Sequence, residues 1–155
     1  MQFLDKSKEL NKNPLLKRVI LFLVGTLLLY LGVDTLLHNQ QIGLTLTTAT
    51  HTILGNEEEF LDPILFDTLL EKTHANLLSS MITIMLLATI YIRLTKYTQK
   101  RQPVIHLTFL TAILSHVALL LTQSYPLLIG IWISLFLLWH LLALYLSVII
   151  LWKLR

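Results

Sequence analysis

Four long apolar runs, separated by shorter polar segments, dominate the chain. They cover residues 18–37, 75–95, 104–123 and 127–152. A helix rises about 1.5 Å per residue, so about 20 apolar residues cross a hydrocarbon core of about 30 Å. Each run is long enough for one crossing. The pattern therefore predicts an all-α fold, an integral membrane four-helix bundle.

The polar segments predict how these helices are connected. Gln-Ser-Tyr-Pro between the last two runs is too short for anything but a helical hairpin, which makes those two helices antiparallel neighbours. The segment 38–74 is much longer, and a loop of such length usually has a structure or a function of its own. Its Thr-rich part, residues 42–54, is compatible with a short helix.

Two signals for the start of a helix follow in the same segment. Asn56, with Glu59 three residues later, has the spacing of a capping box and predicts that a helix begins there. The step Asp62-Pro63 offers a second start, and no helix breaker separates it from the second apolar run. We therefore expect the second span to extend outward as one long helix.

The composition requires a lipid environment. Hydrophobic residues make up 55% of the chain and charged residues only 14%, which is far more apolar than a soluble domain of 155 residues. The chain contains no cysteine, so disulfides, thiolate metal sites and covalent c-type haem attachment are excluded. Any metal would have to be held by histidine and carboxylate.

The basic residues predict the orientation. Of the 12 Lys and Arg residues, five lie within residues 1–18, four lie within residues 93–101, two end the chain, and only Lys72 falls in the segment 38–74. The positive-inside rule therefore places residues 1–17, residues 96–103 and both termini in the cytoplasm. We predict a multi-pass protein of a bacterial-type inner membrane. The net charge of +3 reflects this topology and attraction to anionic lipid, so we exclude nucleic acid as a partner.

Two pairs of acidic and histidine residues fall at the outer ends of the first two spans. Asp34 and His38 are four residues apart, and Glu71 and His74 are three apart, so each pair shares one helix face. His51 lies in the loop between them. If the two spans are neighbours, these five side chains form a ligand set for copper, zinc or iron. The plainer interpretation is that the membrane boundary simply hydrates these polar residues.

The segment Asp34-x3-His38-x12-His51 resembles the Asp-His-His copper-ligand pattern found in one membrane subunit of the copper membrane monooxygenases, the family of the particulate methane and ammonia monooxygenases. In that family the ligands likewise begin at the end of a membrane helix. The resemblance implies that Asp34, His38 and His51 bind copper. It covers only residues 34–51, because the chain has no Asn-x3-His for the family's neighbouring site and the acidic loop 56–71 has no counterpart.

His116 and His140 fall inside the third and fourth runs, where an ionisable side chain is costly and normally has a partner. One interpretation makes them axial ligands of haem b. Counted from the turn between the two spans, however, they differ in depth by about 7 residues or about 10 Å, which argues against one haem within a single chain. His116 would then be a deeper metal ligand. For His140 we favour a hydrogen bond to a side chain across the bundle, and the available hydroxyls are Ser115, Ser134, Thr111 and Tyr145.

The sequence leaves three functional hypotheses. The first is transition-metal binding at the extracytoplasmic face, in metal handling or in a subunit of a membrane redox complex. The second is a cofactor-free accessory or scaffold subunit that packs against other membrane subunits or against further copies of itself. The third is a haem b electron-transfer subunit. No Ser-His-Asp, P-loop, Rossmann or zincin pattern indicates a self-contained enzyme.

Overall fold

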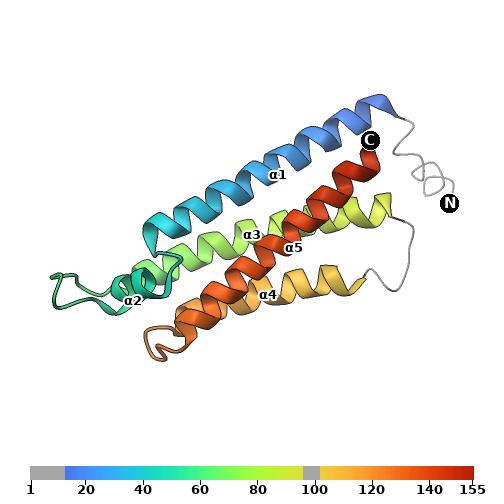
Figure 1. Ribbon diagram of the computed structural model, residues 1–155. Coiled ribbons are helices and arrows are strands. Elements are labelled where there is room, and N and C mark those ends of the chain that lie inside the picture. Colours follow the sequence, from blue (N-terminus) through green and yellow to red (C-terminus); the bar gives the residue numbers. More distant parts are fainter. Residues whose placement is uncertain (1–12, 96–101) are drawn as a thin grey trace.

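A computed structural model describes residues 13–95 and 102–155, and these residues are predominantly helical (Figure 1). The predicted cytoplasmic segments 1–17 and 96–103 lie mostly outside the described residues. The helices are α1 (Pro14–Gln41), α2 (Leu46–Leu54), α3 (Phe66–Leu94), α4 (Gln102–Leu121) and α5 (Leu128–Leu154).

Four of these helices match the four predicted spans. α1, α3, α4 and α5 are each long and apolar enough to cross a membrane. This confirms the prediction of an all-α bundle built from four apolar helices, and it makes the chain a multi-pass membrane protein by the length and composition of its helices. α3 runs without a break from Phe66, so the second span does extend beyond its apolar run as one long helix. α2 lies within residues 42–54, the segment that is compatible with a short helix.

The long helices lie side by side, and successive ones run in opposite directions (Figure 1). One end of the bundle, which we call the loop end, carries α2, residues 55–65 and the turn between α4 and α5. The other end, the terminal end, carries the start of α1 and the end of α5. α5 contacts each of the other four helices and is the central element of the bundle. The cytoplasmic location of the terminal end stays a prediction.

Two clusters of buried apolar side chains hold the helices together. The larger cluster runs along the bundle between the four long helices and includes the fully buried Leu87, Trp139 and Leu146. The smaller cluster lies at the loop end, where Ala49 and Ile53 of α2 pack against α3, α4 and α5. The opposite face of α2 is rich in threonine, and this amphipathic pattern lets a short helix lie across the bundle. α2 therefore covers the loop end.

The first predicted helix start, at Asn56, is wrong. Residues 56–61 form a tight turn that is closed by an antiparallel bridge between Asn56 and Leu61. The Asn56 side chain accepts a hydrogen bond from the backbone N–H of Glu58, as it would at a helix start, but no helical turn follows. Asparagine offers the same local bond to a turn as to a helix, so the signal does not distinguish the two structures.

The second predicted start is also displaced, because α3 begins at Phe66 after an extended stretch at residues 62–65. The backbone of Ile64 explains the delay. Its N–H donates to the carbonyl of Thr52 at 3.1 Å, and its carbonyl accepts a hydrogen bond from the side-chain amide of Gln123 at 2.6 Å. Both backbone groups of Ile64 thus bond to other elements, which keeps this residue out of the helix.

The outward faces of the long helices are apolar, and this gives a direct test of the membrane environment. Leu141, near the middle of α5, is 63% exposed. A lysine at such a position changes the stability of a soluble helix very little. At the centre of a membrane helix, however, it raises the free energy of insertion by about 2.5–3.5 kcal/mol. We expect Leu141→Lys to reduce the membrane-inserted fraction strongly in an insertion assay, and Leu141→Met to leave it unchanged. Equal insertion of both variants would contradict a lipid-facing position.

Candidate functional site

Asp34 and His38 lie on the buried face of α1, as their four-residue spacing allows. Both side chains are nearly inaccessible, at 5% and 4% exposed. Nδ1 of His38 donates to the backbone carbonyl of Asp34 at 3.0 Å and lies 3.5 Å from the carboxylate oxygen Oδ1 of the same residue. One turn of α1 thus presents a carboxylate and an imidazole to the interior of the bundle.

The carboxylate of Asp34 binds a residue that the sequence did not pair with it. Its second oxygen, Oδ2, is 3.1 Å from Nε2 of His140 on α5, which is also buried. Nδ1 of His140 donates to the backbone carbonyl of Phe136 at 2.8 Å. The prediction that a hydroxyl across the bundle would bind His140 is therefore replaced by a bond to Asp34, the acidic residue of the first span.

The other two long helices each add one polar residue to this cluster. The side-chain amide of Asn76 on α3 donates to Nε2 of His38 at 3.1 Å. His116 on α4 is buried, and its Nδ1 donates to the carbonyl of Ala112 at 2.7 Å. It lies close enough to Asp34 and His38 to interact electrostatically with both. We call Asp34, His38, Asn76, His116 and His140 the buried cluster, to which all four long helices contribute.

Two aromatic rings of α5 pack against the histidines of the buried cluster. The ring of Phe136 lies 4.4 Å from that of His38 and 4.2 Å from that of His140, measured between centroids. The indole of Trp139 lies 3.7 Å from the imidazole of His140. These apolar surfaces lower the local dielectric constant, so hydrogen bonds and charges inside the cluster interact more strongly than they would in water.

The hydrogen bonds of His140 determine how many protons it shares with Asp34. A backbone carbonyl can only accept, so Nδ1 of His140 carries a proton. Nε2 and the carboxylate oxygen can then form a hydrogen bond only if one further proton lies between them. The pair is either imidazolium with carboxylate or neutral imidazole with carboxylic acid. In both forms Nε2 of His140 and the Asp34 carboxyl group share one proton, in addition to the proton on Nδ1.

The structure separates the five predicted metal ligands. Asp34 and His38 are together, but Nδ1 of His51 lies 3.2 Å from the Asn56 amide and 3.4 Å from the carboxylate of Glu59. Glu71 and His74 are both exposed on α3. Within residues 13–95 and 102–155, no group of three or more histidine or acidic side chains is placed to hold a metal ion.

The metal and haem hypotheses stay predictions that a purified sample can test. Copper, zinc or iron bound through the predicted set would be lost when His38 and Glu71 are both replaced by alanine. Haem b held by His116 and His140 would give a Soret band in the visible spectrum of the protein. Metal analysis and one spectrum in mild detergent distinguish these two outcomes.

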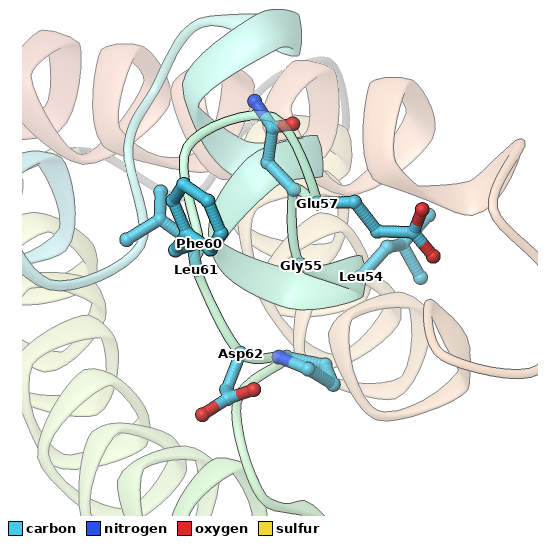
Figure 2. A pocket seen from close by; sticks show the side chains of 8 residues that line it. Leu54, Gly55, Glu57, Phe60, Leu61 and Asp62 are labelled. Atoms are coloured by element: carbon cyan, nitrogen blue, oxygen red, sulfur yellow. The ribbon is translucent and has the colours of Figure 1, made fainter.

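The acidic turn at the loop end does not form a second site. Figure 2 shows that the carboxylates of Glu57 and Asp62 point in different directions around a shallow concavity. Phe60 at the tip of the turn is almost fully exposed. The lining residues are Leu54, Gly55, Asn56, Glu57, Phe60, Leu61, Asp62 and Pro63. They present no convergent set of polar groups.

Comparisons of the chain with protein-family models, with curated proteins and with solved structures give no match. The functional conclusion therefore rests on the buried cluster.

Proposed function

We propose that the protein binds and releases a proton inside the membrane through the Asp34–His140 pair, as part of a proton-coupled membrane process. The observation that supports this proposal is the 3.1 Å contact between the carboxylate of α1 and the imidazole of α5, both about 5% exposed. Ionisable residues buried within membrane helices are costly, and they usually mark proton relays or ion pathways.

The number of protons on the pair is coupled to the packing of α1 against α5. If the shared proton leaves, the lone pair of His140 Nε2 faces a carboxylate, and the two groups repel. If a second proton arrives, it binds the other carboxyl oxygen, Oδ1, and the imidazolium N–H of His140 then donates to a neutral acid instead of a carboxylate. The hydrogen bond is therefore lost when the shared proton leaves, and it is strongest when imidazolium donates to carboxylate. Because α5 contacts every other helix, a change at this bond affects the whole bundle.

The surroundings stabilise the charged form of the pair. The rings of Phe136 and Trp139 are tilted against the His140 ring and lie within 4.2 Å of it, measured between centroids, and aromatic rings at this distance attract a cationic imidazolium. On the other side, the N–H at Nδ1 of His38 lies 3.5 Å from the Asp34 carboxylate and favours its negative charge. The cluster thus favours the form in which His140 holds the shared proton and the Asp34 carboxylate is charged.

The test is to follow the ring nitrogens of histidine by ¹⁵N NMR in lipid nanodiscs while the pH is varied. We expect the signals of His140 to change in a wild-type sample, because its Nε2 gains or loses the shared proton. In Asp34→Asn the change should be altered or lost, since an amide has no ionisable proton to exchange. His106→Gln is the matched control, because His106 is exposed on α4.

Two results would contradict the proposal. One is a His140 signal that stays constant over the whole pH range in which the protein remains folded. The other is the same pH response in the wild type and in Asp34→Asn. A protein with neither this response nor bound metal or haem would match the hypothesis of an accessory subunit.

A further inference from the structure

A polar concavity lies at the loop end between α1 and the first turns of α3. It has a volume of about 280 Å³ and is open to the surroundings. Lys72 of α3 donates from Nζ to the side-chain carbonyl of Gln41 of α1 at 2.8 Å, which ties the two helices together at this point. The lining residues are Gln41, Thr68, Glu71, Lys72, Ala75 and Asn76.

Asn76 connects this concavity with the buried cluster. It lines the concavity, and its amide also donates to Nε2 of His38. From His38 the polar contacts continue to the carboxylate of Asp34 at 3.5 Å and from there to His140 at 3.1 Å. A single side chain therefore separates the surface concavity from a chain of polar groups that reaches α5.

We propose that this concavity is the aqueous access site of the buried cluster, through which water and small cations reach His38 and Asp34. Asn76 is the positioning residue, since its amide covers Nε2 of His38, the ring nitrogen that carries no proton. The proposal deepens the proposed function, because a proton that binds Asp34 must first reach it from water.

The chemistry of an amide explains how Asn76 can control this access. Its nitrogen only donates, so in the observed arrangement it covers Nε2 of His38, the atom that would receive a proton. A half-turn of the amide presents its oxygen instead, which accepts from a protonated Nε2. A proton from water that binds Nε2 allows the proton on Nδ1 to pass to the Asp34 carboxylate. His38 then remains neutral, with its single proton on the other nitrogen.

The first test uses the absence of cysteine from the chain, which makes every introduced cysteine unique. Ala75→Cys places a thiol in the concavity, and Leu78→Cys places one on an apolar exposed face of α3 as the matched control. In reconstituted vesicles a small cationic thiol reagent should modify Ala75→Cys at least about tenfold faster, because a thiol in lipid stays protonated and unreactive. Equally slow modification of both variants would overturn the access site.

The second test examines Asn76 itself through the chemical reactivity of His38. Asn76→Ala should increase the rate at which diethyl pyrocarbonate modifies His38, measured by mass spectrometry, because the free nitrogen loses its cover. Thr68→Ala is the matched control, since Thr68 lines the same concavity without a hydrogen bond to His38 among the described residues. The exposed His74 provides an internal reference in each sample. An unchanged rate at His38 would show that Asn76 does not control access.

The failure of this inference differs from the failure of the proposed function. Neither reactivity test depends on whether the Asp34–His140 pair exchanges a proton. If His140 responds to pH while Ala75→Cys is unreactive, the proton site stands and the access site is wrong. If Ala75→Cys reacts rapidly while His140 never responds, the access site stands and the proton function is wrong.

Discussion

Replacing Asp34 by alanine is expected to lower the free energy of unfolding by about 3–5 kcal/mol, because it leaves a buried histidine without its charged partner. The side chain is 5% exposed and contacts both His38 and His140, so water cannot substitute for the lost carboxylate. Asp34→Asn keeps the size and one hydrogen bond, and it should cost less, about 1–2 kcal/mol. Reversible unfolding in mixed micelles measures both values.

A double-mutant cycle with His140→Ala separates the pair from its surroundings. A hydrogen bond between membrane helices is worth about 0.6 kcal/mol on average, whereas residues in one buried ionic network couple by up to about 3 kcal/mol. We expect the coupling between Asp34 and His140 to approach the higher value. His106→Ala, on an exposed face of α4, should show no coupling with Asp34→Ala. A coupling close to zero for both pairs would mean that the contact contributes nothing to stability.

The four long helices could be predicted from the sequence because a single physical variable determines them. A helix must be apolar over a fixed length to cross a bilayer, and runs of that length are visible without knowledge of any tertiary contact. The loop end depends on long-range bonds instead. The extended conformation of Ile64 requires a carbonyl on α2 and the amide of Gln123, and nothing in the local sequence of residues 55–65 indicates either partner.

The candidate site could be predicted only within one helix. The spacing of Asp34 and His38 places them on one face of α1 wherever that helix packs. The choice of partners depends on the rotation of the other helices. On α3, Asn76 faces His38, whereas Glu71 and His74, which the sequence favoured, lie on exposed positions. Their shared face follows from their spacing, but it is not the buried face of α3.

The depth of His140 could not be compared with that of Asp34 for a related reason. The position of His140 is counted from the turn between α4 and α5, and that of Asp34 from the end of its own apolar run. α1 continues to Gln41, beyond this run. The ends of α1 and α5 are therefore not a shared reference point from which the two depths can be counted. Asp34 therefore lies deeper than its distance from the polar loop suggests. The sequence does contain a signal for this pair. His140 lies in an apolar run and needs a polar partner, and Asp34 is the single acidic residue within the four apolar runs.

Replacing Trp139 by alanine is expected to destabilise the bundle by about 3–5 kcal/mol, the range for removing a large aromatic side chain from a packed core. Trp139 is 1% exposed, lies 3.7 Å from the imidazole of His140 between ring centroids, and meets the ring of Phe136 edge-on at 6.1 Å. Trp152→Ala is the matched control, because Trp152 is 70% exposed at the terminal end. Its replacement should change the free energy of unfolding by about 0.5 kcal/mol or less.

The indole nitrogen of Trp139 makes the substitution by phenylalanine more informative than the one by alanine. Nε1 is buried and has no hydrogen-bond partner among the described residues. Burial of an unpaired donor costs about 1–3 kcal/mol. Trp139→Phe removes this donor, and the stability gained in this way should offset much of the stability that the smaller ring loses in packing. The net change in the free energy of unfolding should then be close to zero. If Trp139→Phe is instead as destabilising as Trp139→Ala, the indole donates to an acceptor beside His140, and the proton site contains a further polar group.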